Sequence, residues 1–161
     1  MDAASLAVTI IHGWLEFMTI SAAGMATWGI RFDLRRLMIV GVIGTTAAQV
    51  IRIMPLRFGI HTILMMFVLL PLIYYMFRPP FLTASCATFG GFTLFLFVEE
   101  VVCFYVLRVL GIHIEDMLAN IAMRSVFGLV TPTVLALYVM LVLWIRGVRT
   151  RRHASKTHPA A

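Results

Sequence analysis

Apolar segments recur along the whole chain, and short polar or proline-containing stretches separate them. The segments run from about Ala4 to Trp28, Leu37 to Met54, Ile60 to Phe77, Phe81 to Leu110 and Ser125 to Ile145. A helix needs about 20 mostly apolar residues to cross a bilayer, and its backbone bonds must be satisfied within it. The pattern therefore predicts an all-α integral membrane protein with five transmembrane helices.

Polar residues interrupt the first two segments at helical spacing, three or four residues apart. They are Thr9, His12, Glu16 and Thr19 in the first segment, and Thr45, Gln49 and Arg52 in the second. Such spacing places each set on one face of its helix. The face in the first segment is interpreted either as a hydrogen-bonded seam or as a water-lined path or proton-sensitive switch, since His12 titrates near neutrality. No basic side chain is expected at the depth of Glu16, which should bond His12, Thr45 or Gln49 or carry a proton.

Two adjacent acids, Glu99 and Glu100, lie inside the apolar run of the fourth segment. An ionised carboxylate near the centre of a membrane helix costs about 2.5–3.5 kcal/mol on insertion scales, so it usually faces a partner. One hypothesis is a structural ion pair with Arg52 or Arg108; the other is a cation or proton site. Neighbouring helical residues point about 100° apart, so both acids cannot face one partner. This favours a homo-oligomer in which one acid faces a neighbouring subunit or a pore.

The stretch between the fourth and fifth segments predicts a short interfacial helix. Its apolar residues Ile114, Met117, Leu118 and Ile121 share one helical face. The segment from Arg146 onward is basic and then small and polar, which is typical of a disordered tail. We therefore expect a membrane domain over residues 1–145 and a cytoplasmic tail over residues 146–161.

The formal net charge is +6, from 13 Lys and Arg against 7 Asp and Glu. The basic residues lie between apolar segments and in the tail, so membrane topology explains them better than nucleic-acid binding. With the C-terminus inside, the inner side collects Arg31, Arg35, Arg36, Arg78, Arg146, Arg149, Arg151, Arg152 and Lys156. The outer side holds Arg52, Arg57, Arg108 and Arg124. The larger inner set predicts a bacterial inner-membrane protein with its N-terminus outside and its C-terminus in the cytoplasm.

Motifs of enzymes and metal sites are missing from the sequence. It contains no HExxH, GxSxG or GxGxxG, and Cys86 and Cys103 lack the spacing of metal ligands. We therefore expect no enzymatic activity, no cofactor and no bound metal.

The segment from Leu56 to Met65, LRFGIHTILM, follows a helix that ends in Arg-Ile-Met-Pro. With the order of the helices over residues 5–145, it resembles the N-terminal multi-pass sensor regions of Firmicutes-type histidine kinases of the GHKL class. The resemblance implies a membrane region that perceives an external peptide or the membrane state and signals to a cytoplasmic kinase. It also implies outward ligand contacts, and the candidates are Arg57, His61, His113, Glu115 and Asp116. No dimerisation helix, phosphoacceptor histidine region or ATP-binding domain follows Arg152, so kinase activity is not expected.

Sensing or signal coupling through an intramembrane polar cluster is the function that the sequence favours. The cluster comprises Glu99, Glu100, Glu16, His12, Gln49 and Arg52. A separate cytoplasmic signalling partner would receive the signal. Two other functions stay open: a small oligomeric cation channel or transporter that uses the glutamates, and a structural subunit of a larger membrane complex.

Overall fold

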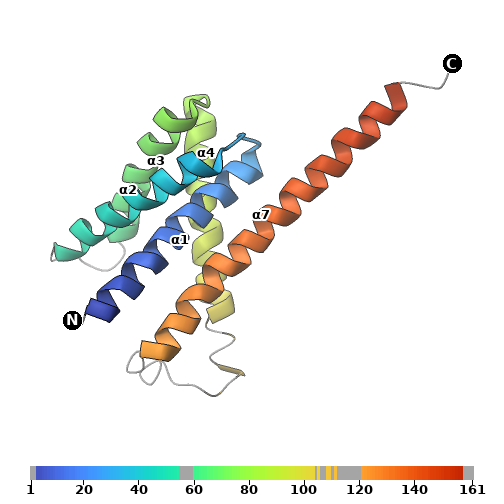
Figure 1. Ribbon diagram of the computed structural model, residues 1–161. Coiled ribbons are helices and arrows are strands. Elements are labelled where there is room, and N and C mark those ends of the chain that lie inside the picture. Colours follow the sequence, from blue (N-terminus) through green and yellow to red (C-terminus); the bar gives the residue numbers. More distant parts are fainter. Residues whose placement is uncertain are drawn as a thin grey trace.

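The fold is a bundle of long helices in one polypeptide (Figure 1). The computed structural model describes residues 3–54, 60–103, 105, 108, 109, 111 and 121–157. Over these residues the chain is helical and contains no strand. Its elements are α1 (Ala3–Trp28), α2 (Leu34–Ile53), α3 (Ile60–Phe77), α4 (Phe81–Val98), the π-helical turn η1 (Glu99–Cys103) and α7 (Ile121–Thr157).

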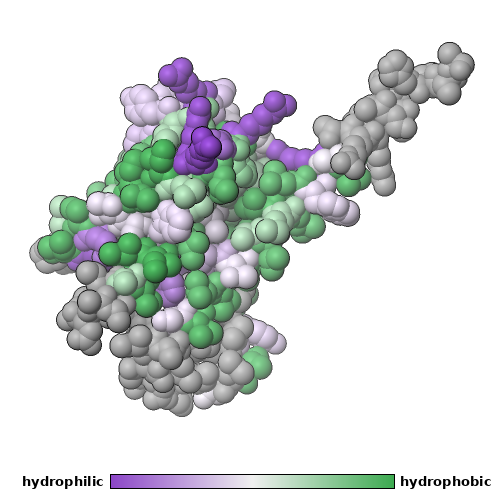
Figure 2. All heavy atoms as spheres, viewed as in Figure 1, coloured by the Kyte–Doolittle hydropathy of each residue, from purple (hydrophilic) through white to green (hydrophobic). Residues whose placement is uncertain are grey.

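Four stretches of the described chain are long and apolar enough to cross a membrane. They are Leu34–Ile53, Ile60–Phe77, Phe81–Val101 and Gly128–Val148. Large apolar side chains cover their outer faces; Phe67 on α3 and Trp144 on α7 are 66% and 67% exposed. Figure 2 shows apolar side chains spread over the middle of the bundle. The expectation of an all-α chain with several membrane-spanning helices is confirmed, although α1 is not among the four stretches.

The most enclosed helix is α1, which has larger contacts with α2, α4 and α7 than any other two helices have with each other. Its residues 21–26 are buried on every side. Two contacts fix its direction relative to α7: His12 lies beside Gly128, and Thr27 lies beside Tyr138. The two helices therefore run parallel. Helix α1 is therefore the element against which α2, α4 and α7 pack.

Small residues allow the helices to approach α1 closely. A Cβ atom on Gly24 would overlap the carbonyl oxygen of Ala87 on α4. On the α2 side, a Cβ atom on Gly44 would lie 2.8 Å from the ring of Phe17, and one on Gly41 would lie 2.6 Å from Trp14. Small residues at such contacts let backbones pack together, which is how membrane helices associate without a hydrophobic driving force between them.

Arginines from neighbouring helices cap the carboxyl ends of α1 and α3. Arg146 donates to the carbonyl oxygen of Thr27 at 2.8 Å, and Arg36 donates to that of Met76 at 2.7 Å. The last carbonyls of a helix lack intrahelical partners and carry partial negative charge, so cationic donors suit them. Gly29, with φ +74°, reverses the chain after α1. Hydrophilic side chains gather at this end of the bundle (Figure 2).

The second and fifth segments are longer than the sequence predicts. Helix α2 begins at Leu34 rather than Leu37 because Asp33 serves as its N-cap. Helix α7 begins at Ile121 and continues through the basic stretch to Thr157. Arg, Lys and Ala are good helix formers, and extending an existing helix needs no new nucleation.

The fourth segment also differs from the prediction in its geometry. It is α-helical only to Val98 and then forms the π-helical turn that carries both acids. The predicted interfacial helix before Ile121 lies outside the described residues. The proposed division between residues 1–145 and 146–161 stays a prediction.

Candidate functional site

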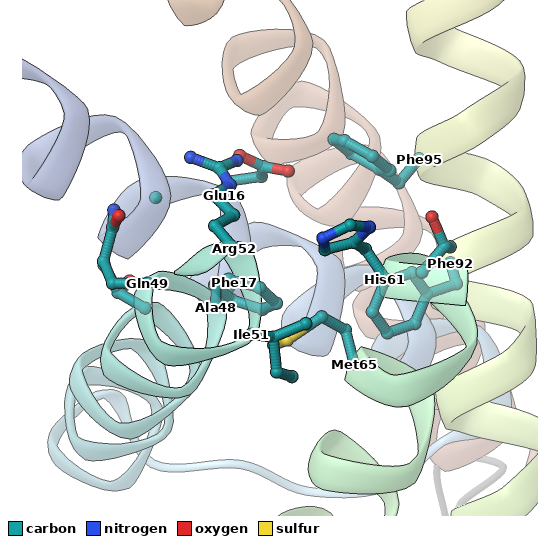
Figure 3. Close-up of a pocket in the computed structure, with 13 residues that line it drawn as sticks. Glu16, Phe17, Ala48, Gln49, Ile51, Arg52, His61, Met65, Phe92 and Phe95 are labelled. Carbon is teal, nitrogen blue, oxygen red and sulfur yellow. The ribbon is translucent and has the colours of Figure 1, made fainter. Parts of the chain in front are cut away.

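A partly open cavity of ≈ 120 Å³, with both apolar and polar lining residues, lies among α1, α2, α3 and α4. Figure 3 shows its lining. The lining residues are Gly13, Glu16 and Phe17 of α1; Thr45, Ala48, Gln49, Ile51 and Arg52 of α2; His61, Thr62 and Met65 of α3; and Phe92 and Phe95 of α4. The cavity lies toward the N-terminal end of α1, away from the arginine-capped end.

The polar stripe of α2 lines this cavity as its spacing predicts. Thr45, Gln49 and Arg52 are one helical turn apart and all three border the cavity. The Thr45 hydroxyl donates to the carbonyl oxygen of Gly41 at 2.8 Å, which satisfies its donor within the helix. Arg52 lies at the end of α2 and is exposed, so the cavity has a charged residue at its rim.

Glu16 is a half-buried acid on the α1 wall of the cavity. The charges of both Glu99 and Arg52 act on its carboxylate. The prediction that no basic side chain reaches the depth of Glu16 is therefore wrong. Arg52 begins nearer the membrane edge, but its long side chain and that of Glu16 extend into the same cavity (Figure 3).

Glu99 and Glu100 lie in η1 and are both exposed. Neither Glu99 nor Glu100 lines the cavity. The hypothesis paired Arg52 with one of these acids, but the Arg52 charge acts on Glu16 instead. Arg108 is exposed in the helical turn beyond η1. A π-helical turn shifts the register of the residues after it and is frequent at functional sites.

His61 and Thr62 in the first turn of α3 complete the polar wall. The sequence grouped His61 with outward ligand contacts, apart from the intramembrane cluster. The structure places it in the lining of the same cavity as Glu16 and Arg52 (Figure 3), and its role as a ligand contact stays a prediction. Met65, Phe92 and Phe95 supply the apolar wall; periodicity alone did not mark them, because they resemble the rest of the core.

His12 belongs to the contact between α1 and α7 rather than to the cavity lining. A Cβ atom on Gly128 would lie 2.8 Å from the imidazole Nδ1 of His12. Glu16 follows His12 by one helical turn, so α1 contributes neighbouring side chains to the cavity and to the contact with α7. The remaining outward candidates, Arg57, His113, Glu115 and Asp116, lie outside the described residues.

No group of three or more His, Cys, Asp or Glu side chains in the described part of the chain could hold a metal ion. The arrangement instead offers one cationic and one anionic side chain, an imidazole, an amide and two hydroxyls around a small space. It can bind or exchange a small polar species by hydrogen bonding and charge pairing.

No protein-family model, curated protein or solved structure matches this chain. The resemblance of residues 5–145 to histidine kinase sensor regions remains a prediction from the sequence.

Proposed function

We propose that this chain is a membrane sensor or signal-coupling module that passes the state of the cavity to α7. The observation that carries the proposal is the position of α1. This helix contributes Glu16 to the cavity and packs along α7 from His12 to Thr27. A ligand changes such an equilibrium only if it binds the two states differently, and a cavity shared by four helices allows that difference.

In this proposal α1 is a fifth membrane span, with the N-terminus outside and the C-terminus in the cytoplasm of a bacterial cell. The parallel direction of α1 and α7 supports an odd number of crossings. Arg31, Arg35, Arg36 and Arg78 are exposed at or near the end where α1 and α3 finish. Such an excess of arginine is typical of the cytoplasmic side. The cavity then opens in the outer half of the membrane.

The test measures whether the cavity and α7 are coupled. Spin labels on exposed Tyr75 of α3 and Gly147 of α7 would report their separation in a chain whose Cys86 and Cys103 are replaced by serine. Glu16→Gln and Arg52→Gln should each shift the distance distribution. The matched control is Thr46→Ala, because Thr46 is exposed on α2 outside the cavity. Identical distributions in all four proteins would refute the coupling.

A second candidate function is a small cation channel or transporter. It is favoured by the presence of two acids, Glu16 on α1 and Glu99 in the turn that continues α4, which packs against α1. Cation flux in proteoliposomes should then fall in Glu99→Gln and Glu16→Gln, with Thr46→Ala as the control. Flux indistinguishable from empty liposomes would exclude this function.

Assembly is a separate proposal: a homo-oligomer, a complex with a cytoplasmic signalling partner, or a structural subunit of a larger complex. Two surfaces support it: exposed Glu99 and Glu100 at one end, and the continuous helix α7 at the other. Native mass spectrometry from mild detergent distinguishes these assemblies. A lone monomer would refute all three.

A further inference from the structure

The cavity among α1 to α4 is small, which limits what can occupy it. An engineered protein cavity of about 150 Å³ holds one benzene molecule. The present cavity measures ≈ 120 Å³. It therefore has room for a ligand of about five or six non-hydrogen atoms, or for several waters. A ligand held wholly within this space is no larger than that.

The cavity is lined by one side chain of each charge. Arg52 of α2 supplies the positive charge, and Glu16 of α1 supplies the negative one. The two side chains share one space, so a ligand that enters between them meets both charges. A simple anion or a simple cation would match one of them and repel the other. A ligand that carries both charges matches both.

The surroundings orient such a ligand. Glu16 places a carboxyl group on the α1 side of the cavity, where it can pair with an ammonium group. Arg52 presents the planar fork of donors that pairs with a carboxylate. Thr62, His61 and Gln49 add hydrogen-bonding groups, and Phe92 and Phe95 leave an apolar corner for a methyl group.

We infer that the cavity binds a small zwitterion, an α-amino acid of the size of glycine or alanine. The inference rests on the proposed sensor function and names its ligand class. The carboxylate pairs with Arg52, and the ammonium group pairs with Glu16. Occupation separates the two side chains, and this movement of α1 relative to α2 is what α7 would transmit.

The experiment measures equilibrium binding of radiolabelled glycine and alanine to the full chain in lipid nanodiscs. Saturable binding of one or both supports the inference when acetate and methylamine compete at least tenfold more weakly. Arg52→Gln and Glu16→Gln should each weaken binding at least tenfold, and Thr46→Ala should leave it within twofold. Competition by phenylalanine should be absent, because its ring exceeds the cavity.

Three results would overturn the inference: no saturable binding of either amino acid, acetate or methylamine competing as well as alanine, or phenylalanine binding as tightly. These readouts use the unaltered chain, so they hold even if a variant fails to fold.

The spin-label distances separate failure of the ligand inference from failure of the proposed function. Altered distances in Glu16→Gln without amino-acid binding would keep the sensor and reject the ligand. Binding without any change in distance would keep the ligand and reject the sensor.

Discussion

Gly91 of α4 faces α1 so closely that a Cβ atom at position 91 would lie 2.5 Å from the carbonyl oxygen of Ile20. The contact is backbone against backbone, so no side chain can rotate away to relieve it. Gly24 makes the reciprocal contact from α1. This glycine pair fixes the distance between the central helix and the helix that leads to Glu99.

Gly91→Ala should therefore destabilise the protein even though alanine is the better helix former. Overpacking a tight contact costs about 1–3 kcal/mol, against a gain of about 1 kcal/mol in helix propensity. The measurement is the free energy of unfolding in detergent micelles. Gly147→Ala is the matched control, because a Cβ atom there meets nothing within 4 Å. Equal stability of the two variants would show that α1 and α4 do not pack this closely.

Thr27 and Tyr138 join the far end of α1 to α7 through hydroxyl groups 2.9 Å apart. A double-mutant cycle of Thr27→Val and Tyr138→Phe should give a coupling energy of about 0.5–1.5 kcal/mol, the net value of one hydrogen bond. The cycle of Thr27→Val with Tyr75→Phe serves as the control, because Tyr75 lies on α3. A coupling energy as small as that of the control would mean that the hydroxyls do not bond.

Gly128 leaves room for the imidazole of His12, and an added methyl group would press against it. Gly128→Ala should lower the free energy of unfolding by about 1 kcal/mol or more. In a His12→Ala background the same substitution should cost much less, because the obstructing ring is gone. The free energy of unfolding is measured for the unaltered chain, the two single variants and the double variant. If Gly128→Ala destabilised the His12→Ala chain by the same amount, the loss of stability would arise from another contact of α7.

The orientation of the chain can be tested by labelling single cysteines in cells. In a chain with Cys86 and Cys103 replaced, a cysteine at Met54 should react with a membrane-impermeant maleimide added outside. A cysteine at Asp33, in the turn after α1, should react only after the membrane is permeabilised. The reverse pattern would invert the topology and move the cavity to the cytoplasmic half.

Much of the helical framework follows from the sequence. Each helix is marked by the length of its apolar segment and by the proline or charged residues that separate it from the next. Helix α3 ends at Phe77, before Pro79, in the structure as in the pattern, whereas α2 begins three residues earlier than predicted because Asp33 caps it. The stripe of Thr45, Gln49 and Arg52 was also predictable, since helical periodicity alone puts these residues on one face.

The partner of Glu16 was not predictable from depth along each helix. Counting residues along a helix gives the depth of each backbone position. Arg52 reaches the cavity through its side chain, which such a count does not describe. Nor does periodicity reveal the π-helical turn at Glu99 or the apolar wall of Phe92 and Phe95. Those features depend on which helices are neighbours, and that order is set by the glycine contacts around α1.

The length of α7 has a mechanical consequence. The apolar span ends at Val148, and the helix continues to Thr157 for about 13 Å at 1.5 Å per residue. A stiff rod that emerges from the bilayer acts as a lever whose tip moves farther than its base. A slight tilt, too small to rearrange the bundle, therefore becomes a larger sideways swing of a basic tip beyond the lipid headgroups.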